Sequence, residues 1–327
     1  MTSNLLVIGT FQDDSLESFF SDALKKYGKV VKHDIGSNII VKYRQQIIIA
    51  FPFVWSFYLK MELSKMYNYN FDIIFIIMRD LPLSNLKDLK KNHPNSKIVN
   101  INPDQMTTIG NMTSLSNLYD LVFLKDKYLG EKMINVGAKN IRYWLECYPQ
   151  KWNNIILDYV PNDNIVILGN IYYYRHLFIE SLICKYKIKN LKIYGKDDKH
   201  VRSLKKNYQI EDYIYGKEKL SIIRNSKIII NNLHFAEITS ANNKFFEISG
   251  IGGFILTEFS SDIYNILPEK LRILIWKNMD ELNDKIKYFT NNPKEREELR
   301  IELNNYAKEN FTYDISVKQI LNKIYNH

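Results

Sequence analysis

Short apolar runs rich in β-branched residues alternate with longer polar segments along the chain. In the first half these runs are NLLVIG (4–9), KVVKH (29–33), FDIIFIIM (71–78), SKIVNI (96–101) and YDLVFL (119–124). The segments between the runs have the length of helices, and the stretch from Asp13 to Tyr27 is amphipathic. Short buried strands separated by helices are typical of a parallel sheet covered on both faces.

The second half repeats this pattern. Strands are expected at NIVILGN (164–170), LKIYG (191–195), DYIYG (212–216), SKIIIN (226–231) and GGFILTEF (252–259). Helices are expected through Tyr186, around residues 198–206, through Asn225 and over 242–249. VPNDN (160–164) has a proline and turn formers and marks a boundary. The pattern predicts an α/β protein with two Rossmann-like doubly wound domains, residues 1–158 and 159–311, and helices over 278–325 closing the chain.

Length and composition agree with this organisation. The 327 residues suit two domains, and the apolar fraction of 46% and charged fraction of 25% are those of a globular protein. QQIIIAFPFVW and FDIIFIIM are too short to span a membrane, so we expect both to be core segments. MTSNLLVIGT has no basic region before its apolar residues, so we expect no signal peptide and a cytoplasmic location. Cys147 and Cys184 are the only cysteines, and we expect two free thiols.

The net charge of +9 predicts attraction to anions. Nucleic acid, an anionic lipid surface and a phosphorylated small molecule all fit that charge. Much of the excess lies in residues 184–206, where lysines alternate with apolar residues as on a solvated surface. No nucleic-acid-binding motif accompanies them, so nucleic acid is not the expected partner.

Candidate ligand-binding residues directly follow the predicted strands of the second domain. In open α/β sheets the ligand lies beyond the carboxyl ends of the strands, where helix amides point at it. Gly169, Asn170 and Arg175 follow one strand, Gly195 and Gly216 end two others, and NNLHFAEITSANN (231–243) follows a fourth. A single glycine at a strand end is most often only a turn. Together these loops predict a site for an anionic ligand of nucleotide size.

The common cofactor and catalytic motifs do not occur. A G-x-G-x-x-G loop, a P-loop and a G-x-S-x-G elbow are absent from the sequence, which disfavours an oxidoreductase, an NTPase and an α/β-hydrolase. The sequence also has no D-x-D, and its six histidines are scattered. We therefore expect a site with neither a metal nor a cofactor.

The chain resembles glycosyltransferases of the spore-maturation CgeB type, which are relatives of the family-4 glycosyltransferases. The resemblance rests on ILGNIYYYRHLFIESL, IYG, SKIIINNLHFAE, NNKFFEISGIGGFILTEFSSDI and NNPKEREELRIELNNYAKENFTY. It is good over residues 164–315 and fainter over 71–150. It implies the GT-B architecture, in which two Rossmann-like domains face a cleft and the C-terminal domain holds the nucleotide sugar. It also implies that residues 312–327 form a helix that crosses back onto the N-terminal domain.

Glu247 is the residue that the resemblance singles out. On a helix over 241–249, Phe245 and Ile248 would face the core and Glu247 would lie off that face. In the related families an acid at this place binds the ribose hydroxyls of the nucleotide. Gly250, Gly252 and Gly253 then let the chain leave the helix and enter the next strand. The alternative is that Glu247 is merely a solvated helix residue.

The resemblance assigns further roles. Lys244 stands where these families often have an arginine, and with Arg175 it would neutralise the donor diphosphate, although either can be an ordinary surface cation. Thr239 replaces the first acid of the family-4 E-x7-E pattern. Hydrogen bonds to phosphate or sugar are expected from Asn170, Thr239, Ser240 and Asn243. Further donor-side expectations are Tyr215 and Gly216 near the base, and His234, for which an ordinary hydrogen-bonded histidine is an equal alternative.

On the acceptor side, Gly9, Thr10 and Phe11 end the first strand and are expected to face the cleft. Asp80 and Asp104 are possible acceptor carboxylates, and the alternative is that they cap the helices that follow them.

The resulting hypothesis is a metal-independent, hexosyltransferase-like enzyme that moves a sugar from a nucleotide diphosphate sugar, with a UDP-sugar as the first expectation. The acceptor stays open among a glycan, a protein, a lipid and a small molecule. Two alternatives remain. One is a nucleotide-sugar epimerase on the same fold, and the other is a non-catalytic basic binding protein with a degenerate cleft.

Overall fold

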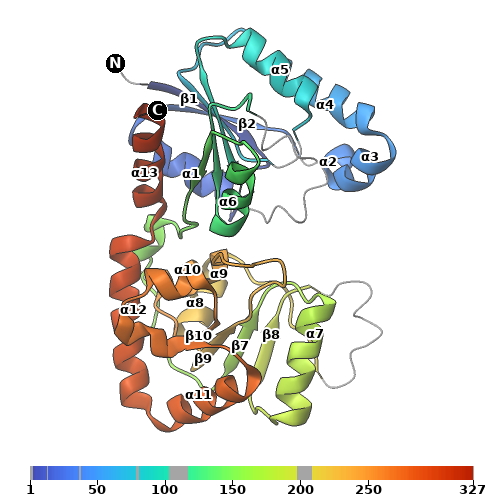
Figure 1. Ribbon diagram of the computed structural model, residues 1–327. Helices are drawn as coiled ribbons and strands as arrows, with labels where there is room; N and C mark the ends of the chain where they lie inside the picture. Colours follow the sequence, from blue (N-terminus) through green and yellow to red (C-terminus); the bar gives the residue numbers. More distant parts are fainter. Residues whose placement is uncertain are drawn as a thin grey trace. The chain divides into compact units, whose positions relative to one another are not determined.

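The computed structural model describes residues 3–12, 14–36, 38–78, 81–102, 117–196 and 208–326. The chain forms two compact units (Figure 1). Unit 1 comprises Met1–Leu145 and Ser316–His327, and unit 2 comprises Glu146–Ile315. The sequence placed the corresponding boundaries at 158/159 and 311/312.

Unit 1 is built on a six-stranded parallel sheet in the order β2-β1-β3-β4-β5-β6. Its strands are β1 (Ser3–Gly9), β2 (Gly28–Asp34), β3 (Ile73–Ile76), β4 (Lys97–Asn102), β5 (Leu121–Leu124) and β6 (Ile141–Tyr143). Its helices are α1 (Leu16–Leu24), α2 (Ile39–Lys42), α3 (Arg44–Ala50), α4 (Pro52–Ser64), α5 (Leu83–Asn92), α6 (Lys127–Asn135) and α13 (Tyr313–Tyr325). The residues of β3 and β5 are all buried, as expected for central strands covered on both faces.

Unit 2 is built on a five-stranded parallel sheet in the order β11-β10-β9-β7-β8. Its strands are β7 (Ile165–Leu168), β8 (Leu191–Tyr194), β9 (Ile228–Asn231), β10 (Ile255–Glu258) and β11 (Ile275–Trp276). Its helices are α7 (Tyr173–Glu180), α8 (Gly216–Asn225), α9 (Asn243–Ile251), α10 (Ser261–Ile266), α11 (Met279–Asn291) and α12 (Pro293–Asn310). A π-helical turn, Ser181–Lys185, extends α7, and 3-10 helices cover Gln150–Asn154 and Glu269–Leu274. The α/β fold class with two parallel sheets is confirmed.

Several expectations about single elements were wrong. DYIYG is not a strand, because only an isolated bridge joins Glu211 to Tyr194, and Gly216 already begins α8. The edge strands β6 and β11 were not predicted, since three and two residues are too short to form a recognisable pattern. The helix expected around 198–206 lies outside the described residues.

The two apolar runs expected in the core differ from each other. FDIIFIIM is buried around β3, as expected. QQIIIAFPFVW instead forms α3 and the start of α4, where Ile49, Phe51 and Phe53 are exposed and only Trp55 is fully buried. Among the described residues, no helix is both long and apolar enough to span a membrane.

Helix α9 ends as its glycines predicted. Gly252 adopts a left-handed conformation (φ 85°) at the C-cap, and its N–H and that of Gly253 donate to carbonyls of the last turn. A Cβ on Gly253 would lie 2.8 Å from the carbonyl oxygen of Ile223, so a larger residue cannot make this close approach. The exit from α9 into β10 is therefore confirmed as a glycine-dependent turn.

The last helix completes unit 1. On α13, Val317, Ile320, Leu321 and Ile324 are buried. Lys97 Nζ donates to the carbonyl of Ile324 at 2.7 Å, so α13 is hydrogen-bonded to the start of β4. The C-terminal residues thus contribute to the core of the unit that contains the N-terminus.

Candidate functional site

Arg175 is hydrogen-bonded to the loops that follow β7 and β9, the two strands between which the strand order of the unit 2 sheet reverses. The chain runs from β7 outward to β8 and then returns to β9 on the other side of β7, so the topological switch point lies between β7 and β9. Nη1 of Arg175 donates to the carbonyl of Asn170, after β7, at 2.7 Å. Nη2 donates to the carbonyl of Asn232, after β9, at 2.8 Å. The guanidinium is therefore fixed where ligands bind in open α/β sheets.

Lys244 lies at the same place. Gly169, directly after β7, has a φ of 114°. A Cβ added there would lie 2.5 Å from Cε and 3.3 Å from Nζ of Lys244, and 3.1 Å from Nη1 of Arg175. Two cations from the first turns of α7 and α9 thus meet over one glycine that has no side chain to separate them. The family resemblance paired Lys244 with Arg175, the strand-end rule selected Gly169, and the fold brings the three residues together.

The charges of this pair depend on burial. Burial lowers the pKa of the Lys244 ammonium to about 8, Glu247 opposes that shift, and the cations Lys219 and Arg175 add to it. Burial also lowers the pKa of Arg175, but a guanidinium stays protonated at neutral pH. The two short hydrogen bonds of Arg175 are to neutral carbonyls and not to a carboxylate. Both cations can therefore attract an anion.

Gly195 supports this arrangement from β8. A Cβ on Gly195 would lie 2.1 Å from the carbonyl oxygen of Gly169 and 2.7 Å from its carbonyl carbon. Because both contacts are to backbone, no side-chain rotation relieves them. Gly195 therefore sets the close packing of the two strand-end turns.

Glu247 is buried and paired. Its side chain is 6% exposed, and Lys219 from α8 donates to Oε1 at 2.9 Å. Asn243 Nδ2 donates to the same oxygen at 3.2 Å, so Oε2 accepts neither bond. Phe245 and Ile248 face the core, as expected. The alternative that Glu247 is a solvated helix residue is wrong.

Lys219 was missed by sequence reasoning. Its side chain is 14% exposed, and its ammonium lies 5.1 Å from the centre of the Trp152 ring. In the sequence it is one of two lysines in KEKLSIIRN, and no local pattern distinguishes it from the other. Only the packing of α8 beside α9 shows that it neutralises Glu247.

The start of α9 is fixed to the end of β9. Asn242 is the N-cap, and its Oδ1 accepts from the backbone N–H of Phe245 at 3.2 Å. Asn231 and Asn242 also exchange two side-chain hydrogen bonds of 3.0 and 2.9 Å. The first turn of α9, with Asn243 and Lys244, therefore begins beside the switch point.

Most of the loop between β9 and α9 is occupied with its own contacts. The His234 ring packs edge-on against Tyr172 at 5.1 Å, and its Nδ1 accepts from the backbone N–H of Ala236 at 3.2 Å. Ser240 is fully buried and donates to the carboxylate of Glu237. The carbonyl of Thr239 accepts from the backbone N–H of Asp262 at 3.0 Å. These contacts give His234, Thr239 and Ser240 structural roles in the loop, whereas their ligand roles stay predictions.

Glu258 was also missed. It ends β10, and its Oε2 accepts from Asn232 Nδ2 at 2.7 Å and from the backbone N–H of Leu233 at 2.9 Å. Burial raises its pKa, while these hydrogen bonds and the charge of Arg175 oppose the rise. Because Glu258 directly follows a buried strand, the strand-end rule that selected Gly169 applies to it equally.

Tyr215 and Gly216 mark the start of α8. Tyr215 is the N-cap residue, its side chain is 57% exposed, and its ring packs against Tyr213 at 4.6 Å. Gly216 has a φ of 51°. The side chain of Tyr215 is thus accessible, and its place near a base stays a prediction.

In unit 1, Gly9 ends β1, next to the β1–β3 switch point of that sheet. Thr10 and Phe11 follow and are partly exposed, and the backbone N–H of Phe11 donates to Asp34 at 3.3 Å. Asp80 and Asp104 lie outside the described residues.

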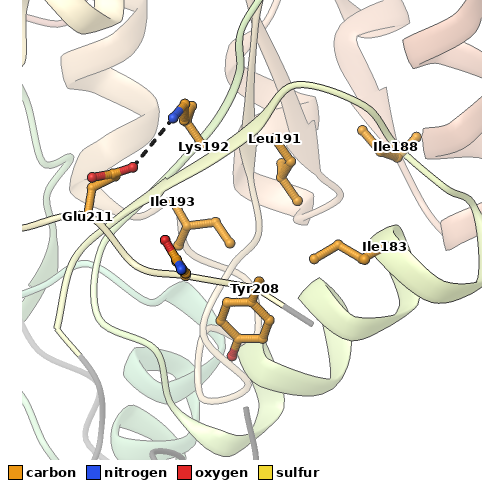
Figure 2. A pocket seen from close by; sticks show the side chains of 8 residues that line it. Ile183, Ile188, Leu191, Lys192, Ile193, Tyr208 and Glu211 are labelled. Atoms are coloured by element: carbon orange, nitrogen blue, oxygen red, sulfur yellow. Dashed lines mark hydrogen bonds and ion pairs between the residues drawn. The ribbon is translucent and has the colours of Figure 1, made fainter. Parts of the chain in front are cut away.

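A separate pocket of about 560 Å³ lies beside the edge strand β8 (Figure 2). It is lined by Ile183, Ile188, Leu191, Lys192, Ile193, Tyr208, Gln209 and Glu211. Lys192 and Glu211 form an ion pair of 3.5 Å at its border. Because the sequence-predicted site residues are not among its lining, this pocket is distinct from the Arg175–Lys244 pair.

Metal-ligating side chains and thiols are two further kinds of candidate site. No group of three or more metal-ligating His, Cys, Asp or Glu side chains occurs among the described residues. Cys147 is buried and Cys184 is exposed, and both are thiols rather than disulfide partners, as expected.

Comparisons with solved structures match the whole chain. A glycosyltransferase from Rickettsia africae superimposes with a TM-score of 0.68 at 13% identity, covering 98% of this chain and 97% of that one. HepE from Anabaena, in complex with UDP and glucose, superimposes with a TM-score of 0.68 at 9% identity, covering 99% and 100%. The chain has the GT-B fold. UDP-GlcNAc 2-epimerase from Neisseria meningitidis shares it with a TM-score of 0.58 at 8% identity, covering 99% and 100%.

By sequence, a family described as glycosyl transferase-like matches residues 175–322. This segment begins at Arg175 and includes Lys219, Lys244, Glu247 and Glu258. A search of curated proteins finds no match.

Proposed function

We propose that the protein is a glycosyltransferase that transfers a sugar from a nucleotide diphosphate sugar to an acceptor. The observation that carries the proposal is the meeting of Arg175 and Lys244 over Gly169, at the switch point of the unit 2 sheet. A donor diphosphate has two or more negative charges, and Arg175 and Lys244 offer such a group two cations in the first turns of two helices.

The chemistry follows from the charge that develops on the leaving group. When the bond from the sugar to the diphosphate breaks, negative charge accumulates on the diphosphate oxygens. Cations that are already in place stabilise this charge without reorganisation. Arg175 is held by two carbonyls, and Lys244 lies within a few ångströms of it across Gly169. The absence of a side chain at Gly169 leaves the space that the end of the Lys244 side chain occupies beside Arg175.

Glu247 suits the ribose of the same donor. Its Oε1 is held by Lys219 and Asn243, which fixes the carboxylate, and its Oε2 accepts neither of those bonds. A carboxylate oxygen is a good acceptor for a ribose hydroxyl. Because Glu247 is one turn further along α9 than Lys244, one helix would contact both the diphosphate and the ribose.

The comparisons support a UDP-sugar as the donor. The family match covers the segment with Arg175, Lys244 and Glu247, and HepE, which shares the fold, binds UDP and glucose. The relationship to the CgeB-type enzymes is also a proposal, and it rests on the sequence resemblance. The acceptor stays open.

Calorimetric titration with UDP, ADP, GDP and their glucose conjugates tests the donor. Lys244→Met and Arg175→Gln should each weaken binding of the preferred nucleotide by about 10- to 150-fold, since a hydrogen bond to a charged group contributes roughly 1.5–3 kcal/mol. Lys287→Met is the matched control, because Lys287 is an exposed lysine of α11 in the same unit. Equal binding by Lys244→Met and Lys287→Met would overturn the proposed donor site.

Metal independence is tested by chelation. With Arg175 and Lys244 neutralising the diphosphate, transfer should continue in EDTA at an unchanged rate. Complete loss of transfer that Mn²⁺ restores would show that a divalent ion, and not this cation pair, carries the leaving-group charge.

The epimerase is the second candidate, because the Neisseria meningitidis enzyme shares the fold. An epimerase interconverts nucleotide sugars without an acceptor, so incubation of the donor alone, followed by chromatography of the sugar, separates the two activities. A binding protein without catalysis would bind the nucleotide sugar but would not cleave it, so no free nucleotide would form, not even through slow hydrolysis by water.

A further inference from the structure

Helices α3 and α4 of unit 1 present a cluster of exposed apolar side chains. Ile49, Phe51, Phe53, Phe57 and Met61 are 85%, 57%, 69%, 65% and 53% exposed, respectively. We refer to these five residues as the aromatic face. Isolated apolar residues on a surface are ordinary, but five exposed apolar side chains within thirteen positions of the chain require a reason.

Helix α4 has two apolar sides, one that is buried in the core and one that belongs to the aromatic face. On α4, Trp55, Leu59 and Leu63 are buried at a spacing of four residues and pack in the core of unit 1. Phe53, Phe57 and Met61 repeat at the same spacing two positions away, on another side of the helix. The core requires only the first stripe, so the second stripe has no role in the fold of unit 1.

Helix α4 holds this face in a fixed orientation. Ser56 Oγ donates to Asn85 Oδ1 at 2.9 Å, and Asn85 Nδ2 donates to the carbonyl of Ser56 at 2.9 Å. Asn85 is buried on α5, so the two helices are joined between the aromatic residues. A groove of about 550 Å³ with predominantly apolar walls lies between α4 and α5, and Phe53 and Phe57 form part of it.

The charges around the aromatic face are mostly positive. Residues 39–65 have a net charge of +3, with four basic residues, Lys42, Arg44, Lys60 and Lys65, and one acidic residue, Glu62. Glu62 pairs with Lys65, and Asp88 of α5 pairs with Lys60, so Lys42 and Arg44 account for the remaining positive charge. Lys42 is exposed, and Lys60 is 64% exposed in its side chain although it lies 3.7 Å from Asp88. Exposed phenylalanines beside lysine and arginine are the combination that places a helix in the interface of an anionic membrane.

We propose that the aromatic face docks on the surface of an anionic lipid bilayer, with Phe53, Phe57 and Met61 inserted among the lipid chains near the headgroups. The 13 residues of α4 are fewer than the roughly 20 that cross a bilayer, so the helix lies in the plane of the membrane. A second copy of this chain fits the face less well, because a two-fold contact would bring two surfaces of charge +3 together.

Flotation of the full-length protein with vesicles tests the proposal. The protein should float with vesicles of phosphatidylcholine mixed with phosphatidylglycerol, and less with phosphatidylcholine alone. The double variant Phe53→Ser/Phe57→Ser should bind the mixed vesicles at least about tenfold more weakly, since each buried phenylalanine contributes roughly a factor of ten or more. Lys42→Glu/Arg44→Glu should lose the preference for phosphatidylglycerol.

Ile156→Ser/Val160→Ser is the matched control, because both residues are exposed apolar side chains of unit 2, at 87% and 66%. It should bind vesicles as the parent does, and both this control and Phe53→Ser/Phe57→Ser should unfold at the same denaturant concentration as the parent because their replaced side chains are exposed. Parent protein that does not float with mixed vesicles overturns the proposal, and so does a Phe53→Ser/Phe57→Ser variant that floats equally well. A dimer by light scattering that the same variant converts to a monomer, without vesicle binding, would assign the face to self-association instead.

Discussion

At the scale of single residues, the buried pair of Glu247 and Lys219 has a stability role and a proposed binding role that can be separated. Glu247→Gln should weaken nucleotide diphosphate binding by about 10- to 150-fold if the carboxylate holds the ribose. It should also lower the free energy of unfolding by on the order of 1.5–3 kcal/mol, because the Lys219 ammonium, in a side chain 14% exposed, loses a charged acceptor. Calorimetry and urea denaturation measure the two effects.

The double variant Lys219→Met/Glu247→Gln is the control for this prediction. It removes the buried cation together with its partner, so it should recover most of the lost stability. Its nucleotide affinity should stay low, since the ribose acceptor is still missing. An affinity that returns along with the stability would mean that Glu247 acts only through the fold.

Lys244 makes a second residue-scale prediction, which concerns pH. Its pKa is about 8 in the folded protein, well below the ordinary value for lysine, chiefly because the ammonium is buried. The charge is present below pH 8 and is lost as the pH rises through that value. Affinity for UDP should therefore fall as the pH rises through about 8, by up to roughly tenfold for each pH unit above it.

The stability of the folded protein changes in the opposite direction to the affinity, because the free energy of unfolding rises with pH. Between the folded pKa of about 8 and the higher unfolded value, the unfolded chain binds more protons, so Lys244 destabilises the fold less as the pH rises. Lys244→Met should remove both pH effects, whereas Lys287→Met should retain them. Titrations with UDP at a series of pH values check this, and an affinity of the parent that is constant across pH 8 would contradict it.

At the scale of elements, the turns after β7 and β8 depend on each other. Gly195→Ala places a Cβ 2.1 Å from the carbonyl oxygen of Gly169, so the backbone must move. This should cost about 1–3 kcal/mol of unfolding free energy and displace Gly169 from the Arg175–Lys244 pair, with weaker nucleotide binding. Denaturant unfolding and UDP titration of the same variant measure both.

Gly130→Ala is the matched control for this substitution. Gly130 lies in α6, and an added Cβ would lie 3.5 Å from a side-chain carbon of Ile141, which is ordinary contact. Alanine in a helix interior should be neutral or stabilise unit 1 by up to about 1 kcal/mol. If Gly195→Ala is equally well tolerated, the two turns do not support each other.

The elements also show what local patterns cannot distinguish. Buried runs such as FDIIFIIM were predictable because every residue except Asp72 is apolar. QQIIIAFPFVW has nearly the same composition, but its residues lie on helices, and each side of a helix has a different environment. The sequence does not show which apolar stripe of α4 meets the core, because that depends on where α5 and the sheet of unit 1 lie.

At the scale of the whole molecule, the C-terminal residues stabilise the unit formed by the N-terminal half. Deleting residues 316–327 removes Val317, Ile320, Leu321 and Ile324, which are all at most 3% exposed. Each contributes roughly 1.5–3 kcal/mol through burial, so unit 1 should lose most of its stability. Amide hydrogen exchange should accelerate in β4 and β6, and much less in β9 and β10.

Lys323→Met is the control for this deletion. Nζ of Lys323 donates to the carbonyl of Tyr143 at 2.8 Å, and removing this one bond should cost only about 1 kcal/mol. If the deletion leaves exchange in β4 unchanged, or accelerates β9 equally, α13 does not belong energetically to unit 1.

The sequence by itself determined the two parallel sheets, the glycine-dependent exit from α9, and the residue types that form the candidate site. These features depend on local chemistry, since strand burial, positive φ and helix capping are set by neighbouring residues. Only the tertiary structure showed that Arg175, Gly169 and Lys244 meet, that Lys219 pairs with Glu247, and that the aromatic face is exposed. The residues of each group are far apart in the chain or lie on different sides of one helix, and their distances depend on how strands and helices pack, which no local pattern encodes.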